Sequence, residues 1–169
     1  PPNEVDALIF SGLSYIRYGD SVAKQPDVQI PLAVAAEEFL ALPDREDRVL
    51  LKKDLELIAR AAETRRFSGV KLFGYQDVKK EAEQIQFSAV TFLLDDGSAF
   101  LAFRGTDSSL VGWKEDFNMS FQDSVPAQRE AAAYVAELAE SYPTLLRLGG
   151  HSKGGNLAVY ASICCDECH

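Results

Sequence analysis

The pattern of apolar and polar positions divides the chain into a helical first part and a second part that contains strands. Apolar residues recur at helical spacing in the first part, which predicts helices over residues 4–18, 31–40 and 46–64. Asn3 is a suitable N-cap for the first of these helices. The buried face expected for this helix comprises Val5, Leu8, Ile9, Leu13 and Ile16.

Short apolar runs replace the helical spacing after residue 69. Runs rich in β-branched and aromatic residues predict strands over residues 70–75, 87–94 and 98–103. The turn signal Asp95-Asp96-Gly97 predicts that the last two of these strands form an antiparallel hairpin.

The rest of the chain predicts a helix over residues 126–141, a strand over residues 145–148 and a buried helix from Gly154 onward. This order of elements suits a mixed sheet with helices packed on it, which is the α/β class. We therefore expect a single domain. Residues 1–69 would form a mostly helical flank, and residues 70–169 would form the sheet and any site that it carries.

One segment has the form of a nucleophile elbow. Residues 150–154 read Gly-His-Ser-Lys-Gly, which matches G-x-S-x-G between a predicted strand and a predicted helix. In such an elbow a sharp turn exposes the serine hydroxyl, here that of Ser152, and the glycines leave room where strand and helix nearly touch. The alternative is that Ser152 is an ordinary helix cap.

A second segment could complete an oxyanion hole, which needs two N–H donors. One donor would be the backbone of Lys153, the residue after the serine. The other would be the backbone of Thr106, which follows a predicted strand in the segment Phe103-Arg104-Gly105-Thr106. The Thr106 hydroxyl could assist. The site expected from the sequence therefore consists of Ser152, Thr106 and Lys153, and needs no metal or organic cofactor.

The two segments together resemble a known group of enzymes. FRGTDSSLVGWKEDFN followed by GHSKGGNLA is similar to the class 3 lipases, which show FRG[ST], then a Trp and an Asp, then GHS-x-G-G. From NEVDALIFSGLSY to GHSKGGNLAVYAS, the chain looks like an uncharacterised bacterial family of lipase-like α/β-hydrolases, a domain of unknown function. The resemblance implies an α/β-hydrolase fold and ester hydrolysis with Ser152 as nucleophile. It also implies a lid around residues 107–114.

The resemblance leaves the reaction and the substrate open. The short, rather polar lid segment disfavours triglycerides and favours a small-molecule or single-chain acyl ester. The alternatives are a thioesterase, peptidase or acyltransferase on the same fold, and a non-catalytic binding protein that retains the elbow.

The sequence does not supply the rest of a catalytic triad in the usual chain order of Ser, then Asp or Glu, then His. Seventeen residues follow Ser152. His151 is expected to project to the opposite side of the turn, packed beside the sheet, and His169 would lie at the far end of a helix, roughly 20 Å away. We therefore expect the N-terminal portion of an α/β-hydrolase, without its C-terminal strands, acid and base, and inactive by itself.

Three nearby side chains have open interpretations. Arg104 could form a buried ion pair with Asp116 or Asp107, or it could be solvated. Trp113 is expected to be a packing residue. Lys153, a cation in the first turn of a helix, opposes the helix dipole, so it could be neutralised by an Asp or Glu or could attract an anionic substrate group.

Composition narrows the functional classes. Lys and Arg number 17 and Asp and Glu 26, giving a net charge of −9, which disfavours nucleic acid as a partner. No apolar run is long enough for a transmembrane segment, and no signal peptide is visible, which favours a cytoplasmic location. The cysteines lie together at Cys164, Cys165 and Cys168, where free thiols are expected in preference to a zinc or haem site.

Overall fold

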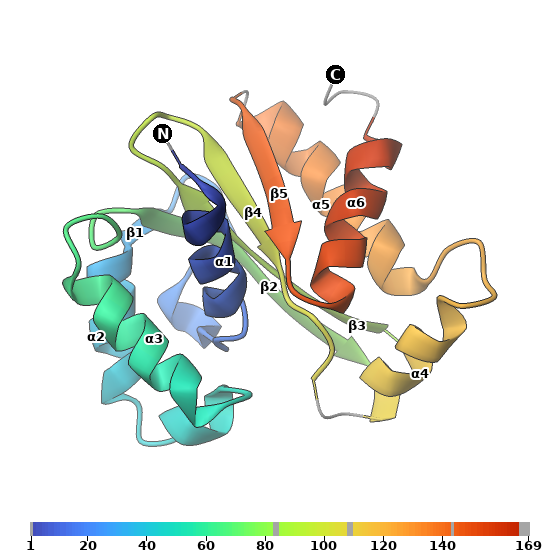
Figure 1. Ribbon diagram of the computed structural model, residues 1–169, viewed down its shortest axis with the longest axis horizontal. Coiled ribbons are helices and arrows are strands. Elements are labelled where there is room, and N and C mark those ends of the chain that lie inside the picture. The colour runs from blue at the N-terminus through green and yellow to red at the C-terminus, as the bar shows by residue number, and fades with distance from the viewer. Residues whose placement is uncertain (1, 83–84, 108–109, 143, 166–169) are drawn as a thin grey trace.

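A computed structural model describes residues 2–82, 85–107, 110–142 and 144–165 as a mixed sheet with helices on both faces (Figure 1). The helices are α1 (Glu4–Leu13), α2 (Leu32–Ala41), α3 (Lys52–Glu63), α4 (Leu110–Asn118), α5 (Pro126–Ser141) and α6 (Lys153–Cys164), with short 3-10 turns η1 (Gly19–Ser21) and η2 (Arg45–Arg48). The strands are β1 (Ile30–Pro31), β2 (Lys71–Lys80), β3 (Ile85–Leu93), β4 (Ala99–Phe103) and β5 (Leu146–Gly150).

The strand order in the described sheet is β1-β2-β3-β4-β5. Neighbouring strands are antiparallel from β1 to β4, whereas β4 and β5 are parallel. Phe103 at the end of β4 pairs with Gly150 at the end of β5. Because parallel strands end at the same edge of a sheet, the segments that follow β4 and β5 begin side by side.

Each face of the sheet has its own hydrophobic core. Helices α1, α2 and α3 cover one face, and α5 and α6 cover the other (Figure 1). Alternate residues of β3 enter different cores: Val90 and Phe92 pack toward the N-terminal helices, whereas Phe87 and Ala89 pack toward α5 and α6. Burial on both faces explains why the central strands are continuously apolar in sequence.

The sequence predicted most of these elements. Helix α5 has the predicted bounds, and the β3–β4 hairpin is antiparallel as expected. Asn3 caps α1 with a capping box, because its side chain accepts the N–H groups of Val5 and Asp6 while the Asp6 carboxylate accepts that of Asn3.

The first helix corrects the sequence-based expectation. It ends at Leu13, not residue 18, because the chain turns there and buries Ile16 and Tyr18 beneath the N-terminal layer. Val5 and Leu8, expected on the buried face, are 61% and 69% exposed. In the part of the chain that the structure describes, no helix has both the length and the apolar character needed to cross a membrane.

Candidate active site

Ser152 lies in a strand–turn–helix elbow, as the G-x-S-x-G motif predicted. Strand β5 ends at Gly150, and α6 begins at Lys153. Ser152 has φ 57° and ψ −125°, and it is the one non-glycine residue with positive φ in the described part of the chain. Such a conformation is costly for a residue with a side chain and is found where the surroundings enforce it, often at functional sites. The serine is exposed to solvent.

Glycines allow the close approach that creates this elbow. A Cβ atom on Gly154 would lie 2.1 Å from the backbone oxygen of Phe103. A Cβ atom on Gly150 would lie 2.5 Å from both that oxygen and the carbonyl carbon of Gly154. No side chain fits at either position, so the two glycines of the motif are required by the packing of β4, β5 and α6.

The loop after β4 lies against the elbow. A Cβ atom on Gly105 would lie 2.6 Å from the His151 backbone oxygen and 3.4 Å from Ser152 Cβ. Thr106 follows Gly105 on this loop, and thus comes from the same edge of the sheet as Ser152. Among the described residues, the backbone N–H groups of Thr106 and Lys153 have no hydrogen-bond acceptor, which leaves both available to an external oxygen.

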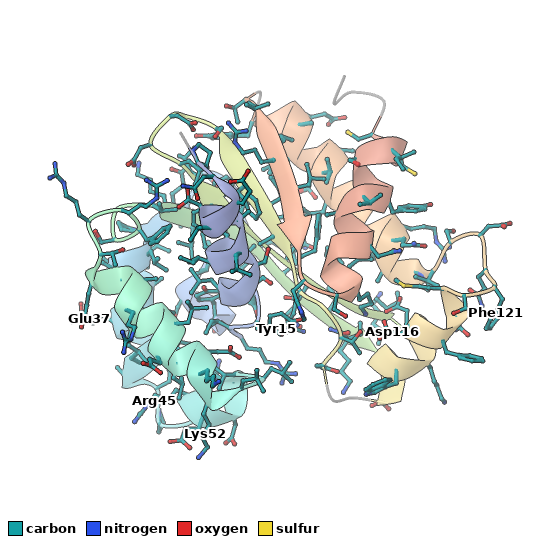
Figure 2. The ribbon with its side chains drawn as sticks, viewed as in Figure 1. Tyr15, Glu37, Arg45, Lys52, Asp116 and Phe121 are labelled. Carbon is teal, nitrogen blue, oxygen red and sulfur yellow. The ribbon has the colours of Figure 1, made fainter. Side chains whose placement is uncertain are left out.

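The Thr106 side chain is held by helix α4. Its hydroxyl donates a hydrogen bond to Asp116 Oδ2. Figure 2 shows Asp116 on the α4 side of the turn between β5 and α6, with Tyr15 on the opposite side. The hydroxyl is therefore committed to positioning the loop, whereas the sequence had suggested that it could assist an oxyanion directly.

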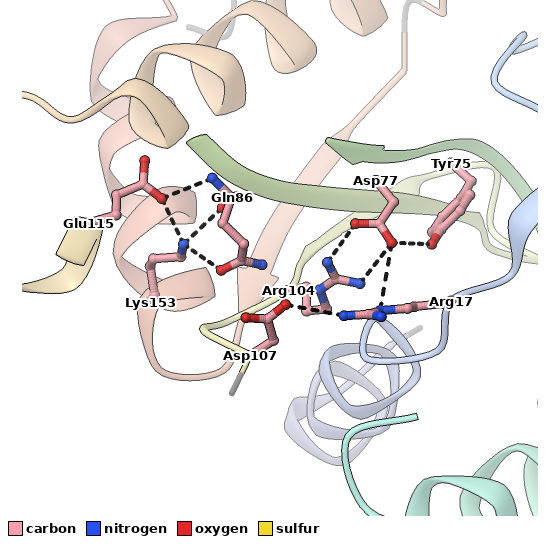
Figure 3. A network of polar contacts seen from close by, with 8 residues as sticks. All are labelled: Arg17, Tyr75, Asp77, Gln86, Arg104, Asp107, Glu115 and Lys153. Carbon is pink, nitrogen blue, oxygen red and sulfur yellow. Dashed lines mark hydrogen bonds and ion pairs between the residues drawn. The ribbon is translucent and has the colours of Figure 1, made fainter. Parts of the chain in front are cut away.

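Arg104 is buried in an ion pair, but its partner differs from the two that were predicted. Its side chain is 3% exposed, and its Nη2 and Nη1 atoms lie 2.6 and 3.2 Å from the Oδ1 and Oδ2 atoms of Asp77 on β2 (Figure 3). The predicted partners bind elsewhere: Asp116 accepts from Thr106, and Asp107 lies 3.1 Å from Arg17 Nη2. Arg104 reaches past β3 to β2, a long-range contact that local sequence could not reveal.

Lys153 is neutralised by a carboxylate, which was the first of its two sequence-based interpretations. Its Nζ lies 2.9 Å from Glu115 Oε2 on α4, and the two side chains are 1% and 0% exposed (Figure 3). The second interpretation, attraction of an anionic substrate group, is wrong because the ammonium group points into the protein and is already paired.

His151 does not pack beside the sheet as expected. It is exposed, and its Nδ1 lies 3.1 Å from the hydroxyl of Tyr15, which follows α1. The same hydroxyl accepts a backbone hydrogen bond from Gly105. Burial raises the pKa of Tyr15, and the Gly105 N–H partly offsets that rise. Sequence reasoning missed Tyr15 because it lies 136 residues from its partner.

The proton acceptor that Ser152 would need is not seen among the described residues. Ser152 Oγ has no hydrogen-bond partner there. The Nδ1 atom of His151 is engaged with Tyr15, and His169 lies outside the described residues. The described side chains also hold no cluster of three or more His, Cys, Asp or Glu residues suited to a metal ion.

The thiols near the end of α6 differ from one another. Cys164 is free and exposed, as expected. Cys165 is disulfide-bonded, which corrects the expectation of free thiols throughout. Cys168 lies outside the described residues.

Helix α4 carries exposed aromatic residues. Trp113, Phe117 and Phe121, in α4 and the turn after it, are 65%, 70% and 63% exposed. Trp113 is therefore not the packing residue that the sequence suggested. The rings of Phe117 and Phe121 meet edge to face, with centroids 5.4 Å apart.

Comparison with known proteins adds one finding. No curated protein and no solved structure matches the chain significantly. A family model, described as Mbeg1-like, matches residues 61–168, which include β2 to β5 and the whole of the elbow. Since the match covers more than half of the sequence, the chain belongs to the Mbeg1-like family.

Proposed function

We propose that the chain carries the nucleophile of a serine hydrolase with an α/β-hydrolase-type fold related to the class 3 lipases. The observation that carries the proposal is the backbone of Ser152, an exposed serine with φ 57° between a strand and a helix. The loop that carries Thr106 lies directly against it. A helix cap needs no such strained conformation, and Ser152 makes no capping hydrogen bond.

The reaction follows from this arrangement. Ser152 Oγ attacks the carbonyl carbon of an ester and transfers its proton to a base, while the carbonyl oxygen becomes an oxyanion. The backbone N–H groups of Thr106 and Lys153 donate to that oxyanion. Collapse of the tetrahedral intermediate releases the alcohol, which takes up the proton, and leaves an acyl-serine. Water then attacks the acyl-serine and releases the carboxylic acid.

We infer that the base is a residue other than His151, since the hydrogen bond found for its ring joins it to Tyr15 and not to Ser152. Its Nδ1 is bonded to Tyr15, and its backbone oxygen and the Ser152 Cβ both flank Gly105. A proton acceptor must come within about 2.6–3.2 Å of the serine oxygen. We therefore assign the base to a group that approaches the exposed face of Ser152.

The surface beside the loop favours a short, polar substrate. A shallow pocket there is lined by Tyr15, Arg17, Arg104 and Asp107, with Asp47, Val49 and Leu50 at its other side. The charged side chain of this pocket that reaches solvent is Arg17, which is 44% exposed, and a long alkyl chain lying over it would desolvate its guanidinium group. We infer that the acyl group is short or polar, and that an ester of this kind is cleaved in preference to a triglyceride.

Labelling with a fluorophosphonate probe tests the proposal on the full-length protein. The probe should modify Ser152, and Ser152→Ala should abolish labelling and hydrolysis of nitrophenyl acetate. Folded protein that shows neither labelling nor turnover would instead be a binding protein that retains the elbow. Nitrophenyl butyrate should be cleaved faster than nitrophenyl palmitate. A preference for acyl thioesters, peptides or transfer to an alcohol would identify a thioesterase, peptidase or acyltransferase.

A further inference from the structure

The ammonium group of Lys153 is fully enclosed by acceptors. Its Nζ lies 2.9 Å from Glu115 Oε2, 2.8 Å from the backbone oxygen of Gln86 and 2.8 Å from Gln86 Oε1 (Figure 3). An ammonium group has three protons, and each has one acceptor here. Lys153 and Glu115 are both buried, with side-chain exposures of 1% and 0%. The side chain is therefore held in one position.

Glu115 extends the contact to other elements. Its Oε1 accepts the N–H of Ala127, 2.8 Å away in the first turn of α5, and its Oε2 also accepts the N–H of Gln86, 3.3 Å away at the start of β3. The carboxylate thus lies at the N-terminal end of a helix, where a negative charge is stabilised. One carboxylate joins α4, α5, β3 and, through Lys153, the start of α6.

Stability alone gives a weak reason for this pair. A lysine in the first turn of a helix opposes the helix dipole. Burying two charges costs desolvation energy, and replacing a buried ion pair with apolar residues of similar size is often neutral or stabilising. The position held by the pair is more informative, because Lys153 directly follows Ser152 and its backbone N–H is a donor in the proposed oxyanion hole.

We propose that the Lys153–Glu115 ion pair is a positioning contact that fixes the Lys153 backbone N–H toward the oxyanion. This inference rests on the proposed function. The pair draws the Lys153 side chain inward and holds the first turn of α6 against α4. Asp116, the neighbour of Glu115, holds Thr106 through its hydroxyl. The two oxyanion donors are therefore both fixed to one turn of α4, and their separation is set by that helix.

The test is the double variant Lys153→Met with Glu115→Met in the full-length protein. It removes both charges and keeps apolar bulk in the buried site, but it also takes the acceptor from the N–H groups of Ala127 and Gln86, so cooperative unfolding is measured first. Lys52→Met with Glu46→Met is the matched control. Lys52 is likewise the first residue of a helix, α3, and it pairs with Glu46 at 3.7 Å, but the two side chains are 88% and 62% exposed.

The double variant should lower kcat for nitrophenyl butyrate by about tenfold or more, with KM changed less than twofold, because the oxyanion forms only after substrate is bound. Affinity for butylboronic acid, which forms a tetrahedral adduct with an active serine, should fall by a similar factor. The control variant, Lys52→Met with Glu46→Met, should change neither kcat nor the affinity for butylboronic acid. If the double variant fails to unfold cooperatively, Glu115→Gln provides a second comparison, because it removes the carboxylate charge that pairs with Lys153 and keeps one acceptor oxygen.

The outcomes separate this inference from the proposed function. Unchanged kcat and unchanged boronic acid affinity in the folded variant, next to an active unmodified protein, would overturn the positioning role alone. Equal losses in the control pair would also overturn it. An unmodified protein with no Ser152-dependent turnover would overturn the proposed function and, with it, the inference.

Discussion

At the scale of single residues, the elbow depends on positions where the backbone leaves no room for a side chain. Gly154 faces the Phe103 carbonyl across a gap in which a Cβ atom would lie 2.1 Å from the oxygen. The obstacle is backbone at the end of a central strand, and it cannot rotate away as a side chain would. Helix α6 can therefore meet the sheet closely enough to expose Ser152 only with glycine at this position.

Replacing Gly154 with Ala should force α6 away from β4. We expect the free energy of unfolding to fall by about 1–3 kcal/mol, as for other overpacked sites, and Ser152 labelling to slow. Urea denaturation and probe labelling measure the two effects. The control is Gly69→Ala, because a Cβ atom there would meet nothing within 4 Å, so its stability should change by less than about 0.5 kcal/mol. Equal stability of the two variants would show that α6 is not constrained at Gly154.

At the scale of elements, the Arg104–Asp77 pair joins the loop after β4 to strand β2. Arg104 is almost fully buried, whereas Asp77 is 27% exposed. Asp77 also accepts a hydrogen bond from Tyr75 and lies 3.9 Å from Arg17 Nε. The loop that carries Thr106 is therefore fixed at one end by this pair and at the other by Asp116.

Replacing Arg104 with Met should loosen this loop. We expect a loss of about 1–3 kcal/mol of stability, discounted from the value for a fully buried pair because Asp77 reaches solvent, together with lower turnover. Thermal unfolding and kcat for nitrophenyl butyrate provide the measurements. The matched control is Arg147→Met, whose arginine pairs with Asp96 at 3.7 Å and is 36% exposed. If both variants behaved like the unmodified protein, Arg104 would have no role in holding the loop.

The spacing of apolar residues along the sequence identified the elements that depend only on neighbouring positions in the chain. Helix α5 and the β3–β4 hairpin follow directly from apolar spacing and a turn signal. It did not reveal α4, in which Trp113 and Phe117 are exposed, or β1, which has two residues and exists because it pairs with β2. Where the neighbouring layer decides which residues are buried, as in α1, the pattern alone was wrong for Val5 and Leu8 and right for Leu13.

The residues of the candidate site also differ in whether the sequence alone could identify them. Ser152, Thr106 and Lys153 could be proposed from the sequence because their motifs are contiguous and the proposed chemistry is tied to a strand end. Their supporting partners could not be found, because the sheet brings them together from distant parts of the chain. Glu115 lies 38 residues from Lys153, and Asp77 lies 27 residues from Arg104.

At the scale of the whole molecule, the N-terminal helical layer contributes to the site as well as to the core. The family match begins at residue 61, but Tyr15 and Arg17 precede it and contact His151 and Asp107 beside the elbow. A second polar contact lies within this layer: the Asp6–Arg66 pair joins α1 to the turn after α3. Arg66 Nε donates to Asp6 Oδ1 at 2.6 Å.

This pair should make stability depend on acid pH. The hydrogen bond from Arg66 lowers the pKa of Asp6 below its ordinary value of 3.8, outweighing the opposing effect of burial. A carboxyl group with a lower pKa in the folded state stabilises the fold above its unfolded pKa, and this contribution disappears as the pH falls through the folded pKa. Asp6→Asn should therefore be less stable than the unmodified protein at pH 7, and the difference should shrink below about pH 4.

Urea denaturation from pH 7 to pH 3 measures this difference in the free energy of unfolding. The control is Asp27→Asn, at an exposed position, which should show no such difference. A deficit of equal size at every pH would mean that Asp6 acts through its shape and its cap on Asn3, and that its charge does not hold the N-terminal layer.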